Sequence, residues 1–268
     1  MISKNITFIG AGNMCKAHVS GFLESGICTC ENIKVVGRDP EKLMDFKKIG
    51  IYPAKDIHEA AEFADIIFIS VKPKDCEAVC LELAKENLAD KTVVSIAAGI
   101  TMAFYEKMLG KTVAVCRAMP NTPILVGMGA TFLCRNKNVP DKDFDLIYEM
   151  FRALGFVCKG NEEQINAVIG ASGSGPAYVY LMIKAMCDWA IAHGISEGDA
   201  KKLVCATFSG AAAMVENATV PITDLIRTVS CPGGTTLKAL EVFEKENFER
   251  IVSDAMDACE KRAAELTK

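Results

Sequence analysis

The sequence lacks cysteines and histidines at the close spacing that could bind a zinc ion. It has only three histidines, His18, His58 and His193, and they lie far apart. Its twelve cysteines are scattered along the chain, and none belongs to a Cys-x-x-Cys pair. Structural zinc sites need such closely spaced ligands, so the sequence predicts no metal site. We interpret the cysteines as reduced and mostly buried apolar residues, and the histidines as structural or surface residues.

Blocks of like charge and long apolar runs are also absent. The 30 basic and 34 acidic residues are interspersed and give a net charge of −4, which excludes a basic nucleic-acid footprint or a polybasic anchor. The most apolar segment, 176–195, carries Lys184 and Asp188, which disfavours a membrane span. Residues 1–5 are too few for the start of a signal peptide. We therefore expect a cytoplasmic protein that binds neither membranes nor nucleic acids.

Short β-branched runs alternate with helical segments through the first half of the chain. This alternation predicts an α/β fold with a parallel, doubly wound, Rossmann-type sheet. Asp39 before Pro40, and Asp56 three residues before Glu59, are start signals for two of the helices. The predicted strands cover 6–9, 33–36, 66–71, 92–97 and 112–116, and runs at 130–134 and 156–158, around a helix at 141–153, complete the sheet.

The strand signal disappears after Asn161. Apolar residues then recur at helical spacing, as at Ile222, Leu225, Ile226 and Val229. The length of 268 residues and the 50% hydrophobic content are enough for two domains. We predict a dinucleotide-binding domain over 1–161 and an all-α domain over 162–268.

The turn Gly10-Ala11-Gly12 follows the first predicted strand and opens a helix. Backbone amides at the positive end of that helix can approach a pyrophosphate where no Cβ interferes. Cys15 occupies the usual third glycine position, and Ala17 is the better candidate for close packing of helix on strand. The alternative is an ordinary glycine-rich turn, but the strand, turn and helix context favours a dinucleotide site.

The end of the second strand indicates which dinucleotide binds. An NAD-specific protein needs an acid here for the ribose hydroxyls, whereas this chain has Gly37 followed by Arg38. An arginine suits a 2′-phosphate, so we expect NADPH, with NADH as a possible second cofactor. Asp39 is better explained as a helix cap.

Three more loops follow strands at the edge where such sheets bind ligands. They are Val71-Lys72-Pro73, Ala97-Ala98-Gly99 and the segment 119–123. Lys72 either faces the cofactor or is a solvated turn residue. The other two loops suit the shaping of a nicotinamide pocket.

The helical half contains two glycine-rich loops. Ser172-Gly173-Ser174-Gly175-Pro176 precedes a long apolar helix, and it is either a helix cap or a place where backbone approaches a ligand. The segment 230–236 concentrates free amides that can hold a small carboxylate. The alternative for this second loop is a simple turn between helices.

These residues together resemble pyrroline-5-carboxylate reductase, the enzyme of the last step of proline biosynthesis. The resemblance covers essentially the whole chain, and its six matching segments occur in the same order. They are Gly10-Ala11-Gly12-Asn13-Met14, Val71-Lys72-Pro73, Ser95-Ile96-Ala97-Ala98-Gly99, Arg117-Ala118-Met119-Pro120-Asn121-Thr122-Pro123, residues 172–178 and Pro232-Gly233-Gly234-Thr235-Thr236.

The resemblance implies a reaction and a set of site residues. Hydride would pass from NADPH to the imine carbon of 1-pyrroline-5-carboxylate, giving L-proline. The resemblance implies that the loop amides bind the substrate carboxylate, that the Thr236 hydroxyl faces the ring nitrogen, and that the helical domain forms a homodimer or larger homo-oligomer. Cys231 replaces the usual serine. The implied substrate-binding residues are Cys231, Gly233, Gly234, Thr235 and Thr236. The predicted cofactor-binding residues are Gly10, Ala11, Gly12, Asn13, Met14, Arg38, Val71, Lys72, Pro73, Ala97, Ala98 and Gly99.

Two other functions need comparison. A β-hydroxyacid dehydrogenase has the same two-domain plan and glycines like Gly170, Gly173 and Gly175 of this chain. In that family a catalytic lysine follows the last glycine by four positions, and here Val179 occupies that position. A non-catalytic NADPH-binding sensor is the other alternative. Turnover of NADPH with the imine distinguishes the sensor from the enzyme.

Overall fold

The computed structural model describes residues 3–267, which form two compact units. The first contains the chain up to Ser174 together with the segment from Cys259 onward, and the second is Gly175–Ala258. The domain boundary after Asn161 stays a prediction.

The first unit is built on a seven-stranded sheet with the order β2-β1-β3-β4-β5-β6-β7. β1 to β5 are parallel, β6 is antiparallel to β5, and β7 is parallel to β6. The strands are β1 (Ile6–Ile9), β2 (Ile33–Val36), β3 (Ile66–Ile69), β4 (Thr92–Ser95), β5 (Ala114–Pro120), β6 (Gly129–Arg135) and β7 (Gly155–Lys159).

All seven expected strands are present, but the direction of β6 was not evident from the alternation. Only the short 3₁₀ turn Thr122–Val126 and its flanking residues connect β5 to β6. A parallel connection needs a crossover of a dozen or more residues, so the chain returns antiparallel instead.

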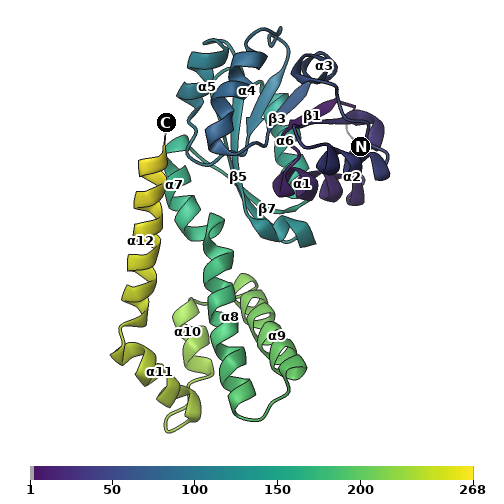
Figure 1. Cartoon of the computed structure of the whole chain (residues 1–268). Helices are drawn as coiled ribbons and strands as arrows, with labels where there is room; N and C mark the ends of the chain where they lie inside the picture. The colour runs from purple at the N-terminus through teal and green to yellow at the C-terminus, as the bar shows by residue number, and fades with distance from the viewer. Residues whose placement is uncertain (1–2, 268) are drawn as a thin grey trace. The chain divides into compact units, whose positions relative to one another are not determined.

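Helices cover both faces of this sheet, and Figure 1 shows α4 and α5 on one side with α1 and α2 on the other. On one face Phe8 and Phe68 of the sheet share a core cluster with Phe22 of α1, and on the other Ile67 of the sheet shares a core cluster with Tyr105 of α5. The helices of this unit are α1 (Asn13–Glu24), α2 (Pro40–Lys48), α3 (Ile57–Phe63), α4 (Cys76–Leu83), α5 (Met102–Leu109), α6 (Asp141–Arg152), α7 (Ile165–Val168) and the last part of α12 (Phe248–Leu266). The expected Rossmann-type architecture is confirmed.

The predicted helix starts at Asp39 and Asp56 are confirmed. The Asp39 carboxylate accepts bonds from the amides of Glu41 and Lys42, with Pro40 at the first helical position. Asp56 accepts from the Glu59 amide at 2.9 Å. The Glu59 side chain accepts from the amide of Lys55 instead of closing the box on Asp56.

The second unit contains only helices and turns, as expected for the second half of the chain. Its elements are α8 (Gly175–Ala192), α9 (Glu197–Glu216), α10 (Ile222–Thr228), α11 (Thr235–Lys245) and the first part of α12 (Phe248–Leu266). No helix within residues 3–267 is long and apolar enough to cross a membrane.

The segment before α8 differs from the expected loop. α7 continues into a π-helical turn at Ile169–Gly173, and the Ser172 hydroxyl donates to the Val168 carbonyl at 3.3 Å. Because the backbone is already helical before α8, Ser172 is not a helix cap. Short π-helical turns are often found at functional sites.

Candidate active site

The turn between β1 and α1 contains two glycines with different roles. Gly10 has φ +112°, and a Cβ on it would lie 2.8 Å from the Ser70 carbonyl carbon and oxygen. Gly10 is therefore required for the close approach of this turn to the end of β3. A Cβ on Gly12 would meet nothing within 4 Å, so the space above Gly12 is open for a ligand.

The first amides of α1 are available to an anion. Gly12 is the N-cap, no side chain caps the helix, and the Lys16 amide donates to the Gly12 carbonyl at 3.0 Å. The amides that precede Lys16 in the first turn have no intrahelical acceptor. This arrangement suits a pyrophosphate.

A cavity of about 750 Å³ lies at the carboxyl ends of β1, β2 and β3. This is the edge at which a doubly wound sheet binds its ligand. Of the predicted cofactor residues, Gly10, Ala11, Gly12, Arg38, Val71 and Lys72 line the cavity. Asn13, Met14, Pro73, Ala97, Ala98 and Gly99 are not among the residues that line it.

The end of β2 presents a cation to this cavity. The Arg38 side chain is 85% exposed, and its guanidinium lies 3.0 Å from the Asp75 carboxylate, which follows β3. Gly37 has a packing reason of its own, because a Cβ there would lie 3.0 Å from the Cβ of Ala11. An acidic side chain at position 37 would crowd the phosphate turn.

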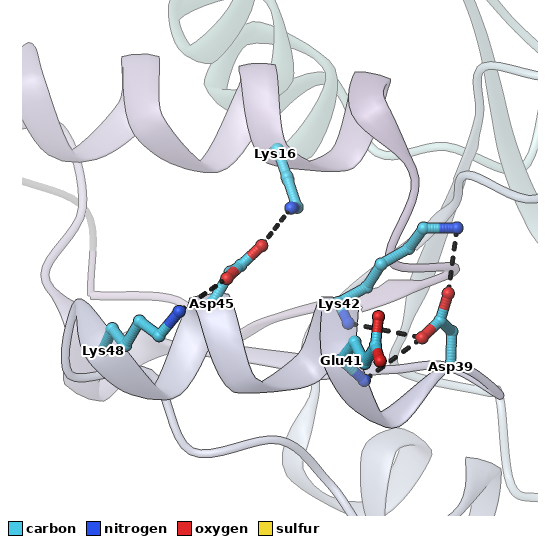
Figure 2. Close-up of polar contacts among 6 residues, drawn as sticks. All are labelled: Lys16, Asp39, Glu41, Lys42, Asp45 and Lys48. Carbon is cyan, nitrogen blue, oxygen red and sulfur yellow. Dashed lines mark hydrogen bonds and ion pairs between the residues drawn. The ribbon is translucent and has the colours of Figure 1, made fainter.

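Lys42 is a second cation that lines this cavity, and it was not predicted from the sequence. It lies in the first turn of α2, and its ammonium is 3.1 Å from the Asp39 carboxylate. Figure 2 shows the Lys42 side chain reaching back to Asp39, whereas Lys16 and Lys48 meet at Asp45 farther along α2. The available signal was the position of Lys42 in the first turn of the helix that follows Arg38.

Gly99 accommodates a neighbouring segment of its own unit. It has φ +74°, and a Cβ on it would lie 2.8 Å from the Leu266 carbonyl oxygen near the end of α12. The predicted role of Gly99 in cofactor binding stays a prediction, but close packing alone explains why this position is glycine.

Asn121 links three segments of the first unit and was not singled out from the sequence. Its amide nitrogen donates to the Ser172 carbonyl at 3.1 Å, and its amide oxygen accepts from the Ala130 amide at 2.8 Å. Asn121 is buried, and Gly173 lies close enough that a Cβ on it would be 3.3 Å from Met119. The end of β5 is thus fixed to the π-helical turn and to β6.

The candidate substrate loop belongs to the second unit and connects α10 to α11. Gly233 has φ +78°, and the Gly234 amide donates to the Cys231 carbonyl at 2.9 Å. Gly234 is the N-cap of α11, and no side chain caps this helix. Thr235 and Thr236 begin the helix and are exposed, so their amides and hydroxyls are available to a carboxylate.

The three histidines have different surroundings. His18 is fully buried, whereas the exposed His193 ring stacks on Trp189. His58 is exposed and lies 2.8 Å from the Glu86 carboxylate, which raises the pKa of His58. His58 and Glu86 both line the cavity, a placement that the sequence did not indicate.

Comparisons with known proteins agree with this arrangement. Residues 162–266 match the family model for pyrroline-5-carboxylate reductase dimerisation, and residues 5–99 match that for NADP oxidoreductase, coenzyme F420-dependent. A pyrroline-5-carboxylate reductase of Escherichia coli (strain K12) is 37% identical over 268 residues, covering 100% of both chains. One from Pisum sativum is 32% identical, covering 99% of this chain and 97% of the relative.

Solved structures give the same result. The pyrroline-5-carboxylate reductase of Coxiella burnetii has a TM-score of 0.91 at 37% identity, with 100% of both chains covered. The Plasmodium falciparum pyrroline carboxylate reductase with NADP bound has a TM-score of 0.91 at 29% identity, again over 100% of both chains. The resemblance inferred from the sequence motifs is confirmed: the chain belongs to the pyrroline-5-carboxylate reductase family.

Proposed function

We propose that the protein reduces 1-pyrroline-5-carboxylate to L-proline with NADPH. The observation that carries this proposal is the open phosphate turn at Gly12 beside the cavity that Arg38 lines, in a chain of this reductase family. When bound, the dinucleotide supplies the hydride that reduces the imine carbon. The ring nitrogen takes a proton, so one C–H bond and one N–H bond form and the C=N double bond becomes single.

The residues at the sheet edge hold the cofactor in this proposal. The amides of the segment Gly10 to Met14 bind the pyrophosphate, with Gly12 leaving the necessary space. Arg38 and Lys42 bind the 2′-phosphate, which favours NADPH over NADH. The loops Val71-Lys72-Pro73 and Ala97-Ala98-Gly99 flank the nicotinamide half.

The loop before α11 holds the substrate. The free amides at Gly233, Gly234, Thr235 and Thr236 bind the carboxylate, and the Cys231 position contributes through its backbone. The Thr236 hydroxyl is the one side chain that we assign to the reacting ring, where it hydrogen-bonds the nitrogen. An imine accepts hydride more readily once protonated, and a hydroxyl can pass that proton from water, so no histidine is needed.

The second unit supports assembly of two or more copies. Within Gly175–Ala258, all of which the structure describes, the buried apolar residues are only Ala190, Ala200 and Val204. Helices that expose so many large apolar side chains need a partner surface. The exposed residues include Tyr180, Leu181, Trp189, Leu203, Met214 and Val229. Since a family dimerisation segment covers this region, we propose a homodimer or a larger homo-oligomer. A cytoplasmic location stays a prediction.

Turnover tests the proposed function directly. Purified protein is mixed with NADPH and 1-pyrroline-5-carboxylate, and the absorbance of reduced nicotinamide is followed. We expect loss of absorbance that depends on the imine, with formation of proline. No such loss would contradict the proposal and would favour a non-catalytic NADPH-binding protein.

A variant of Thr236 tests the assigned side chain. Removing one hydrogen bond to a polar ligand costs about 1 to 3 kcal/mol, so Thr236→Val should lower kcat/KM roughly tenfold to a hundredfold without weakening NADPH binding. Thr228→Val is the matched control, because the exposed Thr228 hydroxyl bonds only within α10, to the Leu225 carbonyl. Unchanged imine kinetics in Thr236→Val would place the substrate elsewhere.

A further inference from the structure

We propose that Tyr105 is a positioning residue for the reaction, acting through a buried chain of hydrogen bonds that joins the turn after β3 to the turn after β4. The inference rests on the proposed function, which places the nicotinamide half of the cofactor between these turns. Tyr105 lies on α5 and is not among the residues that line the cavity. Its effect on the reaction is therefore transmitted through other groups.

The chain begins at Ala97, the first residue of the turn Ala97-Ala98-Gly99. The Ala97 amide donates to the Ser95 hydroxyl at 3.2 Å, and that hydroxyl lies 2.6 Å from the Tyr105 hydroxyl. Tyr105 in turn donates to the Cys76 sulfur at 3.8 Å, and the Cys76 thiol contacts the Lys72 carbonyl at 3.8 Å. The two contacts with sulfur are weak, whereas the contact between the two hydroxyls is short.

One assignment of protons satisfies every member of the chain. If Tyr105 donates to sulfur, Ser95 must donate to the Tyr105 oxygen, which leaves the Ser95 oxygen to accept from the Ala97 amide. Cys76 then donates its thiol proton to the Lys72 carbonyl. In this arrangement Ser95 and Tyr105 each donate once and accept once, so removal of either hydroxyl takes a hydrogen-bond partner from the other.

Burial makes this chain rigid. Ser95, Tyr105 and Cys76 are all 1% exposed or less, and Tyr105 is among the largest fully buried side chains. Burial also raises the pKa of Tyr105, so the phenol keeps its proton at physiological pH. A buried hydroxyl that loses its partner cannot form a hydrogen bond to water instead. The loop that this hydroxyl holds is then free to shift.

The two ends of this hydrogen-bonded chain lie in the turns that flank the proposed nicotinamide site. Lys72 lines the cavity, and Ala97 begins the turn at the carboxyl end of β4, the strand next to β3. Hydride transfer requires the two reacting carbons to be held in close register, and a small displacement lowers the rate strongly. Tyr105 therefore sets the distance between two walls of the nicotinamide pocket.

The test is Tyr105→Phe, which removes the hydroxyl and keeps the ring that fills the core. We expect kcat/KM for NADPH to fall roughly threefold to thirtyfold. The dissociation constant of adenosine 2′,5′-bisphosphate, which occupies only the adenosine half of the site, should not change. Ser95→Ala should reproduce this pattern, and the double variant should be little worse than either single variant because both break the same chain.

Thr7→Val is the matched control. Its buried hydroxyl donates to the Ala60 carbonyl at 2.9 Å, in the same unit and outside the chain. We expect a lower melting temperature with the kinetics of the wild type. If Tyr105→Phe behaves in the same way, or if its effect and that of Ser95→Ala are additive, the positioning role is overturned. An inactive wild type would instead contradict the proposed function itself.

Discussion

His18 makes the stability of the first unit depend on pH. It lies on α1 with no exposed surface, among the rings of Phe8, Phe22, Phe68 and Phe151. Its Nδ1 is 2.6 Å from the Met14 carbonyl, and within the described residues its Nε2 is the one buried side-chain nitrogen or oxygen without a partner. Nδ1 therefore carries the proton and donates it, and protonation of Nε2 would bury an unpaired positive charge.

The magnitude follows from the shift in pKa. Burial lowers the pKa of His18 from 6.5 to about 4, while the bond to Met14 opposes this in part. Below its ordinary pKa the unfolded chain binds a proton that the folded chain excludes, so stability is lost as the pH falls from about 6.5 toward about 4. The full loss is about 3 kcal/mol, and about 2 kcal/mol of it falls between pH 7.5 and pH 5.

Urea unfolding followed by circular dichroism, at one protein concentration and at both pH values, measures this loss. His18→Leu removes the titrating group. Between pH 7.5 and pH 5 the free energy of unfolding of this variant should therefore fall by about 2 kcal/mol less than that of the wild type. His58→Gln is the control: Glu86 raises the pKa of the exposed His58, so its contribution has the opposite sign. Equal pH dependence in the wild type and His18→Leu would show that His18 does not exclude a proton in the folded state.

Two further predictions concern the cofactor end of the cavity. Gly10→Ala should lower the melting temperature strongly, because the new Cβ would lie 2.8 Å from the backbone of Ser70. Gly12→Ala should keep the wild-type melting temperature and weaken NADPH binding in a titration, because a Cβ there would meet only open space. Equal melting temperatures for the two variants would contradict this prediction. Arg38→Ala, and to a smaller extent Lys42→Ala, should raise KM for NADPH more than KM for NADH, while Lys48→Ala, which removes a cation from the same helix, should change neither. Equal effects on both cofactors would show that Arg38 does not contact the 2′-phosphate.

Local signals in the sequence were sufficient for most of the fold. Strands at 6–9 and 33–36 match β1 and β2 residue for residue, because buried parallel strands are short, continuous β-branched runs between turn residues. Asp39 before Pro40 was equally clear, since a cap depends only on its immediate neighbours. The strands predicted to end at 71 and 97 end earlier, at Ile69 and Ser95, because the chain leaves the sheet at the ligand-binding edge.

The contacts that were not predicted from the sequence join residues that are distant in the sequence. Gly99 resembles a pocket turn until Leu266 is seen against it. Asn121 holds the carbonyl of Ser172, and the position of Tyr105 beside Ser95 requires α5 to be folded onto the sheet. Local spacing contains no information about such contacts, which appear only when the tertiary packing is known.

The fate of the transferred hydrogen tests the proposed hydride transfer directly. NADPH carrying deuterium at C4 of the nicotinamide, prepared as each of its two stereoisomers, is incubated with the protein and 1-pyrroline-5-carboxylate, and the proline is analysed by mass spectrometry and NMR. We expect a single deuterium on the ring carbon that was the imine carbon, from one of the two stereoisomers only. Failure to form proline, or proline without deuterium from either stereoisomer, would contradict direct hydride transfer to the imine.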